Sequence, residues 1–195
     1  MITATLKRII YALVILLVVT VSAFAASTTD DNKSRNIYQL FKNTNPKLSA
    51  ETARKYVDIV MEAGKKYKQD PYVIAAIIVH ESTVKADAVS KGGDYGLMQV
   101  RWKVHEKAIK AEYPKIRKAT DFFDARTNIF FGTRILSECA AKSKDLRGAL
   151  LRYSGGGTKV TAKVMNTVKQ LQSMDSKTKP KKRSFWDRLF NRNKS

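Results

Sequence analysis

The chain has 195 residues and carries 37 Lys and Arg against 17 Asp and Glu, which gives a formal net charge of +20. That length suits one domain of ordinary size with tails, and that charge indicates an anionic partner: a nucleic acid, a membrane or a cell-wall polymer. One cysteine, Cys139, allows no intrachain disulfide, and the two histidines, His80 and His105, are too few and too scattered for a zinc site. Cys139 stands in an apolar run, so we expect a buried core residue there. We expect neither a metal nor another cofactor.

The N-terminus combines the parts of an export signal. Basic residues precede an apolar run from Ile9 to about Val21, and an Ala-x-Ala ending follows at Ala25. This pattern predicts a secretory signal peptide over residues 1–25, cleaved after Ala25. The apolar run is long for a signal peptide, so an uncleaved membrane anchor is the alternative. Either way we expect an exported protein, periplasmic or extracellular, which an anchor would hold at the membrane.

The next stretch predicts a lead-in and a first long helix. In residues 26–47 we expect a loose polar start and then a short helix around Ile37 and Phe41. Ser49 is placed as an N-cap, with acidic charge in the turn that follows. Apolar side chains then recur at three- and four-residue steps, which predicts an amphipathic helix with these residues on its buried face: Tyr56, Val60, Ala63 and Tyr67.

A second helix is predicted from Asp70 and Pro71, which suit a cap and a first helical position. The run that follows, YVIAAIIVH, is apolar almost all round, as in a helix that is buried on most sides. Glu81 comes directly after this run. A carboxylate there is costly to keep charged, so its pKa should rise, and a carboxyl that stays protonated near neutral pH can act as a general acid.

Beyond Glu81 the chain predicts one wall of a cleft and then more helices. Residues 82–96 are small, polar and Gly-rich, and Leu97 to Val100 return to apolar character. No long stretch alternates with period two, so the fold class predicted is all-α with little or no sheet. The expected later helices cover residues 102–113 (ended by Pro114), 121–141, 146–153 (capped by Asp145) and 159–174.

The last residues, 175–195, differ in composition from the rest. A basic segment with one proline leads to Phe185, Trp186, Leu189 and Phe190, which a helix would place on one side. Aromatic side chains among Arg and Lys suit the headgroup layer of an anionic membrane. A disordered basic tail is an equal alternative. We do not expect a nucleic-acid partner for an exported chain.

Two separated motifs carry a family resemblance. Glu81-Ser82, Ala88, Ser90, Gly92 and Gly96-Leu97-Met98-Gln99 resemble the signature of the soluble lytic transglycosylase (SLT) domain, which is related to goose-type lysozyme. The spacing agrees, because Ser90 follows Glu81 by nine residues and Gln99 follows it by eighteen. Downstream, Arg152-Tyr153-Ser154-Gly155-Gly156 resembles the family's Ala-Tyr-Asn-x-Gly loop, and Asn128 and Gly132 match its Asn-Ile-x-x-Gly helix. The resemblance covers about residues 50–173.

The resemblance implies a lysozyme-like catalytic domain over residues 48–174 that acts on peptidoglycan glycan strands. It further implies cleavage of the β-1,4 bond between N-acetylmuramic acid and N-acetylglucosamine, with 1,6-anhydromuramoyl ends as the product. Glu81 would be the sole acid and base. Ser90, Gln99, Tyr153 and Met98 would bind substrate, although Ser90 can also be a plain turn serine, Gln99 can instead stiffen the loop, and Met98 is better expected in the core.

The sequence also allows other functions. A hydrolytic muramidase of the same fold would need a second carboxylate, for which Asp87 and Asp94 are the candidates. A non-catalytic wall- or membrane-binding module is a further alternative. The chain also departs from the family where Arg101 and Trp102 follow Gln99, with Trp102 either a stacking platform or core, and where Arg152 and Ser154 flank the tyrosine.

Overall fold

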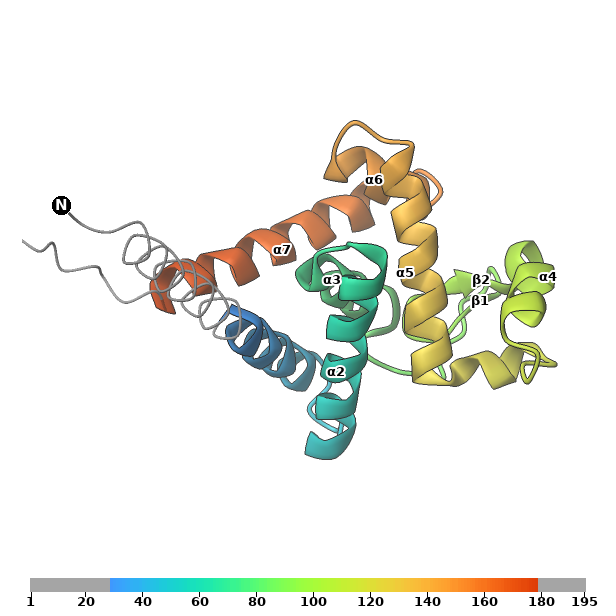
Figure 1. The fold of residues 1–195 in the computed structure, drawn as a ribbon, viewed down its shortest axis with the longest axis horizontal. Coiled ribbons are helices and arrows are strands. Elements are labelled where there is room, and N and C mark those ends of the chain that lie inside the picture. Colours follow the sequence, from blue (N-terminus) through green and yellow to red (C-terminus); the bar gives the residue numbers. More distant parts are fainter. Residues whose placement is uncertain (1–28, 179–195) are drawn as a thin grey trace, which may run out of the picture.

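The computed structural model describes residues 29–178, so the predicted export signal and most of the predicted basic tail lie outside the described residues. Residues 29–44 are helical, and the remaining elements follow in chain order (Figure 1). They are α2 (Ala50–Tyr67), α3 (Pro71–Ser82), β1 (Asp94–Tyr95), β2 (Val100–Arg101), α4 (Trp102–Glu112), the 3-10 helix η1 (Ala119–Phe123), α5 (Ala125–Ala141), α6 (Leu146–Tyr153) and α7 (Thr158–Thr178). The predicted all-α fold is confirmed, because the described sheet is a hairpin of two short antiparallel strands.

Three of the predicted helix starts are confirmed by their caps. The Ser49 hydroxyl accepts the backbone N–H of Thr52, and Asp145 accepts that of Gly148 at 2.7 Å. Asp70 accepts the N–H of Tyr72 at 3.1 Å, directly before the proline that opens α3. Each cap satisfies a backbone donor that the first turn of a helix leaves without an intrahelical partner.

The predicted helix over residues 121–141 is divided in the structure. Its first residues belong to η1, where the Asp121 carboxylate accepts the backbone N–H groups of Arg117 and Lys118. Asp124 then caps α5 by accepting the N–H of Thr127 at 2.8 Å. Two acidic residues three positions apart therefore hold two separate turns, and the apolar pattern continues across the break because both turns face the same core.

The N-terminal helix is also longer than the sequence indicated. Residues 29–35, expected to be loose, continue the helix that contains the fully buried Ile37 and Phe41. Its polar side chains join the rest of the domain: Asn36 donates to the Tyr72 hydroxyl at 2.9 Å and to Asp175 at 3.0 Å. Helix 29–44 therefore belongs to the folded unit and meets the end of α7.

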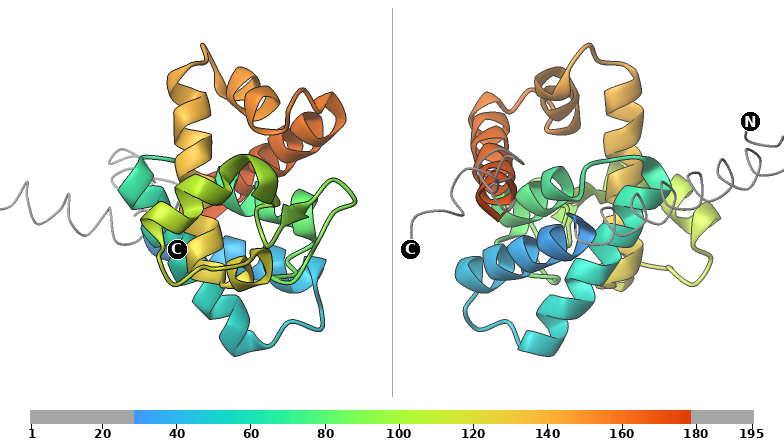
Figure 2. Two further views of the ribbon diagram at one scale, coloured as in Figure 1. Left: turned by 90° about the vertical axis from the view of Figure 1, so that its right-hand side faces the viewer. Right: turned by 60° about the vertical axis from the view of Figure 1, so that its left-hand side comes forward.

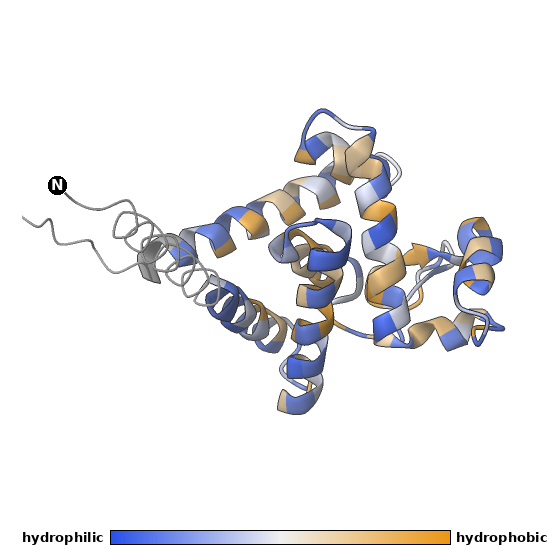
Figure 3. Cartoon of the chain, in the orientation of Figure 1, coloured by the Kyte–Doolittle hydropathy of each residue, from blue (hydrophilic) through white to orange (hydrophobic). Residues whose placement is uncertain are grey.

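Helix α3 lies at the centre of the fold. It contacts α2 and α7, while α5 contacts α2 and α6, and the hairpin and α4 extend on the other side of α5 (Figures 1 and 2). Nearly every residue of α3 up to Ile78 is buried, in agreement with its all-round apolar sequence, and its turns are among the most hydrophobic in Figure 3. Burying each such aliphatic side chain contributes about 1.5–3 kcal/mol. Within residues 29–178, no helix is long and apolar enough to cross a membrane.

Removal of the Tyr72 hydroxyl tests how much its hydrogen bonds, which join helix 29–44 to the core, contribute to stability. It donates to Asp175 on α7 at 2.6 Å while accepting from Asn36. We expect Tyr72→Phe to lower the free energy of unfolding in urea by about 1–2 kcal/mol, since the half-buried Asp175 and Asn36 each lose a hydrogen bond. Tyr38 lies in helix 29–44, and its hydroxyl makes no hydrogen bond within the described residues. Tyr38→Phe should therefore change the free energy of unfolding by less than about 0.5 kcal/mol. Equal effects would contradict this account.

Candidate active site

A cleft of about 470 Å³ lies where the end of α3 meets the hairpin, α4, α5, α6 and the start of α7. Four of its lining residues are acidic or basic, namely Glu81, Asp94, Arg101 and Arg152. The other lining residues are Gln99, Val100, Val104, His105, Ile135, Tyr153, Ser154, Gly155 and Val160. Elements far apart in the sequence thus surround the carboxyl group that the sequence singled out.

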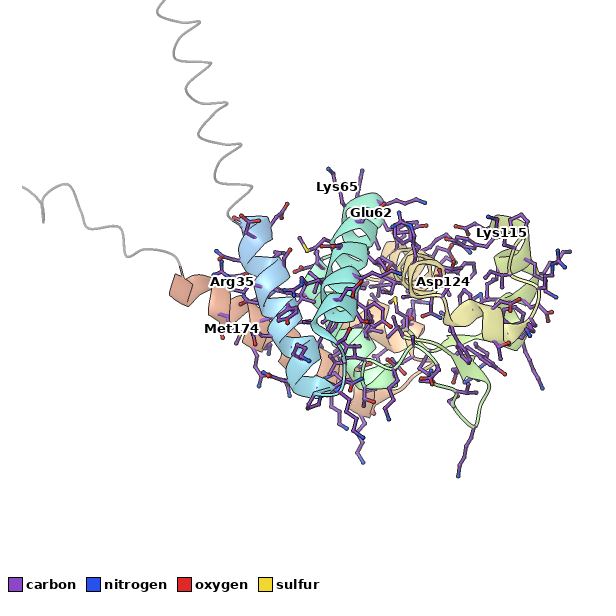
Figure 4. All side chains as sticks on the ribbon, turned by 90° about the horizontal axis from the view of Figure 1, so that it is seen from below. Arg35, Glu62, Lys65, Lys115, Asp124 and Met174 are labelled. Carbon is purple, nitrogen blue, oxygen red and sulfur yellow. The ribbon has the colours of Figure 1, made fainter. Side chains whose placement is uncertain are left out.

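Larger cavities lie elsewhere on the described chain, but their residues are less suited to proton donation. One of about 640 Å³ lies beside α2 and the start of α5, where Glu62 and Asp124 project from the surface (Figure 4). The Arg126 guanidinium binds Glu62 there and holds the pKa of that exposed carboxyl below its usual range. A carboxylate of this kind is a poor proton donor, so volume alone does not locate the active site.

Glu81 lies in the last turn of α3, at the inner end of the cleft. Thr83 and Val84, with φ of 50° and 60°, end the helix and turn the chain away directly after it. Burial raises the pKa of the Glu81 carboxyl above its usual value, and the negative charge of Asp94 raises it further. Both effects disfavour the charged form, so Glu81 has the electrostatic setting of a general acid.

Asp94 stands on the hairpin opposite Arg101, in the register that pairs these two residues. The Arg101 Nε donates to Asp94 Oδ1 at 2.6 Å and its Nη2 to Oδ2 at 3.0 Å. Hydrogen bonds from Arg101, supported by the Ser90 hydroxyl, hold the pKa of Asp94 below its usual value. The other candidate for a second carboxylate, Asp87, is exposed and does not line the cleft.

Ser90 closes the tip of the glycine-rich loop. Its hydroxyl donates to Asp94 Oδ2 at 2.8 Å and accepts the backbone N–H groups of Gly92 and Asp94 at 3.2 and 3.1 Å. It is absent from the cleft lining. These contacts are those of a turn serine that orients Asp94, and substrate binding by Ser90 stays a prediction.

Gln99 both lines the cleft and stiffens the loop. Its Nε2 donates to the carbonyls of Ala88 and Gly96, both at 3.0 Å, and its backbone takes a left-handed φ of 48°. Its Oε1 accepts no hydrogen bond from residues 29–178, so an acceptor remains for a ligand. The two roles expected for this amide are therefore compatible.

A hydrogen bond from the Tyr153 side chain to the backbone links Tyr153 to Met98. The Met98 side chain is fully buried, and its sulfur lies where a Cβ on Gly132 would come within 2.7 Å of it, so it packs on α5 rather than facing the cleft. Its carbonyl accepts the Tyr153 hydroxyl at 2.8 Å. Burial and the charge of Glu81 raise the pKa of Tyr153 well above its usual value, which keeps the phenol protonated.

Asn128 on α5 fixes the backbone of the motif around Met98. The amide is fully buried, and its Oδ1 accepts the Met98 N–H at 2.8 Å. Its Nδ2 donates to the carbonyls of Tyr95 and Phe122 at 2.9 and 3.2 Å. Three backbone groups from two segments thus depend on one side chain, and the family motif was the only sequence signal for it.

Several other expectations meet a clear outcome. Trp102 is buried against the rings of Tyr95 and Phe122, so it belongs to the core and is not a stacking platform. Cys139 is only partly buried, contrary to the expected core position, and it lies in the last turn of α5, where the Ser143 hydroxyl donates to its backbone carbonyl. His105 was set aside from sequence, yet it lines the cleft one turn after Arg101, and that helical spacing could have pointed to it.

The domain is all-helical and lysozyme-like, and the end of its central helix places the half-buried Glu81 carboxyl in a cleft. The comparison with family models is more specific: residues 58–176 match the Transglycosylase SLT domain, more than half of the chain. The chain therefore belongs to the transglycosylase SLT domain family. It is also 34% identical over 108 residues to the Membrane-bound lytic murein transglycosylase C of Salmonella arizonae, a match that covers 54% of this chain and 30% of that protein. The chain thus spans under a third of that relative's length.

Replacement of Asn128 should destabilise the domain from within the site. We expect Asn128→Ala to lower the free energy of unfolding in urea by about 3 kcal/mol, because three buried backbone groups each lose a hydrogen bond of about 1 kcal/mol. Hydrogen exchange at the Met98 amide should accelerate in the same variant. The exposed Asn43→Ala is the matched control, and a loss of similar size there would contradict the role of Asn128.

The pKa of Glu81 can be measured directly from the carboxyl carbon shift in an NMR titration. Asp94 raises this pKa, so Asp94→Asn should move it downward by removing the negative charge. Arg101→Gln also breaks the ion pair but keeps that charge, so it should not lower the pKa of Glu81. A downward shift in both variants would show that loop disorder, rather than charge, controls the acid.

Proposed function

We propose that this chain is a peptidoglycan lytic transglycosylase, which cleaves the β-1,4 bond between N-acetylmuramic acid and N-acetylglucosamine and leaves 1,6-anhydromuramoyl ends. The observation that carries the proposal is Glu81, the carboxyl in the cleft whose pKa is raised. Membership of the SLT domain family supports the reaction class. The Salmonella arizonae relative is named a lytic murein transglycosylase, which agrees with this proposal.

In the proposed mechanism Glu81 acts twice. Its protonated carboxyl first donates to the glycosidic oxygen, and the bond from that oxygen to the muramoyl ring breaks as positive charge develops on the ring. The resulting carboxylate then accepts the proton of the 6-hydroxyl on the same muramoyl residue. The 6-oxygen closes onto the ring carbon that lost its partner, so the carboxyl regains its proton and no water is consumed.

The state of Asp94 favours this route over hydrolysis. A hydrolase of this type needs a second carboxylate that attacks the sugar or activates water. Asp94 reaches the cleft, but Arg101 and Ser90 occupy both of its oxygens and its pKa is lowered, which weakens it as a base. Because Asp94 nevertheless lines the cleft, a hydrolytic muramidase is the second candidate function, and the products decide between the two.

The remaining site residues receive supporting roles in the proposal. The free Oε1 of Gln99 is available to an N–H of a sugar acetamido group. Tyr153 places its ring on the cleft wall while its hydroxyl holds the Met98 carbonyl. Ser90 keeps Asp94 in place and can bind substrate only if the loop opens, whereas Met98 contributes through its backbone.

We also propose that the protein works outside the cytoplasm, close to a membrane. The sequence supports this through the export signal or anchor over residues 1–25 and the basic aromatic segment in 175–195. The described chain begins and ends on the same side, because Asn36 contacts Asp175 near the end of α7 (Figure 1). Both segments would therefore continue from one end of the domain, while α4 and the hairpin lie at the opposite end.

Mass spectrometry of fragments released from purified peptidoglycan tests the proposed reaction. We expect fragments with anhydromuramoyl ends, one water lighter than hydrolysis products. Glu81→Gln should reduce their release by roughly 100-fold or more, the usual contribution of a general acid. Glu51→Gln, an exposed carboxyl in the first turn of α2, should leave the release unchanged.

Other products would lead to other conclusions. Reducing muramoyl ends would identify a hydrolase and make Asp94 the second carboxylate to replace. A protein that binds peptidoglycan and releases nothing would be a binding module. Activity that survives in Glu81→Gln would remove Glu81 from the mechanism.

A further inference from the structure

Both arginines of the cleft stand where the chain departs from the SLT motif pattern. Arg101 follows the Gly-Leu-Met-Gln-Val segment on β2, and Arg152 precedes Tyr153 at the end of α6. They come from two elements that both border the cleft. The departures therefore concentrate positive charge inside the cavity that holds Glu81.

The charge of Arg101 is already compensated. Its guanidinium binds both oxygens of Asp94 through Nε and Nη2, which is a two-point ion pair. The pair lies on the hairpin and is partly exposed, with 19% of the Asp94 side chain accessible. Arg101 and Asp94 together thus add little net charge to the cleft.

Arg152 is different because its guanidinium has no ion pair or hydrogen bond within residues 29–178. It is exposed at the last turn of α6, next to the half-buried Tyr153. Because Arg101 pairs with Asp94, Arg152 is the arginine of the cleft whose charge has no partner in the described part of the chain. Burial lowers the pKa of His105 and favours its neutral form, so Arg152 is the unpaired positive group among the described residues that line the cleft.

We propose that Arg152 is a substrate-selecting residue that binds a carboxylate carried by the muramoyl sugar next to the scissile bond. This inference rests on the proposed function, because the ligand is part of the same glycan. A muramoyl residue carries a lactyl group that is either a free carboxylate or the start of an acidic peptide. A guanidinium presents its donors as a planar fork that matches a carboxylate, and a ligand that fills the cleft excludes water from this pair.

Binding to the Glu81→Gln protein tests the assignment without any turnover. Three probes are compared by calorimetry: a peptidoglycan tetrasaccharide with its acidic peptides, the same fragment with its carboxyls converted to amides, and the peptide-free glycan with free lactyl carboxylates. We expect the second substitution Arg152→Gln to weaken binding of the acidic probe about tenfold and to leave the amidated probe unchanged. Arg152→Lys should fall between, because it keeps the charge and loses the fork.

Arg147→Gln is the matched control, since Arg147 is exposed on the same helix and does not line the cleft. It should change binding of no probe. Loss of the peptide-free probe in Arg152→Gln would identify the lactyl carboxylate as the group bound, and loss of the acidic peptide probe alone would identify the peptide. Equal effects on the acidic and amidated probes, no effect on any of the three probes, or no binding of any probe by the parent protein would overturn the inference.

The outcome is separable from that of the proposed function. A protein that binds acidic probes through Arg152 but releases no anhydromuramoyl ends would retain this carboxylate site and lose the proposed reaction. A protein that releases these ends from acidic and amidated peptidoglycan alike, with or without Arg152, would retain the reaction and lose the carboxylate site.

Discussion

The geometry of the site depends on the amide of Asn128, which holds the loop against α5. The loop between Glu81 and Gln99 contains three glycines, and its own backbone hydrogen bonds, such as that from Gly96 to Ala88, join the loop to itself and not to α5. Asn128 accepts one backbone N–H and donates to two carbonyls in a place closed to water. An amide is one of the few side chains able to do both, and without it these buried groups would each cost free energy.

The same region shows why two glycines stand where they do. A Cβ at Gly96, which has a φ of +80°, would come within 2.2 Å of the Asn128 Nδ2. A Cβ at Gly132 would come within 2.8 Å of the Met98 Cβ. Close approach of α5 to the loop is thus built into both segments, and it brings the Met98 carbonyl to the Tyr153 hydroxyl. The cleft wall is held by polar contacts behind it, away from the space a substrate would fill.

The sequence predicted those features that depend on local chemistry. Helix periods, the caps at Ser49, Asp70 and Asp145, and the apolar character of α3 could all be read from neighbouring residues. It failed where one contact joins distant segments. Residues 29–35 continue a helix whose Asn36 binds Tyr72 and Asp175. For Trp102 the sequence left core and cleft positions open, and its packing on Phe122 places it in the core. The place of Glu81 in a cleft was expected from the motif, but the ion pair that neutralises Asp94 required the hairpin register.

The pairing of Asp94 with Arg101 bears on how one carboxyl can serve as both acid and base. The negative charge of Asp94 raises the pKa of Glu81, which disfavours the carboxylate that remains after proton donation. An unpaired neighbour with a raised pKa could itself take up a proton and activate water. Arg101 prevents the second outcome, since it lowers the pKa of Asp94 and binds both of its oxygens. The mechanism that we propose requires Glu81 to lose and regain a proton within one reaction, and the pairing of Asp94 leaves that role to Glu81.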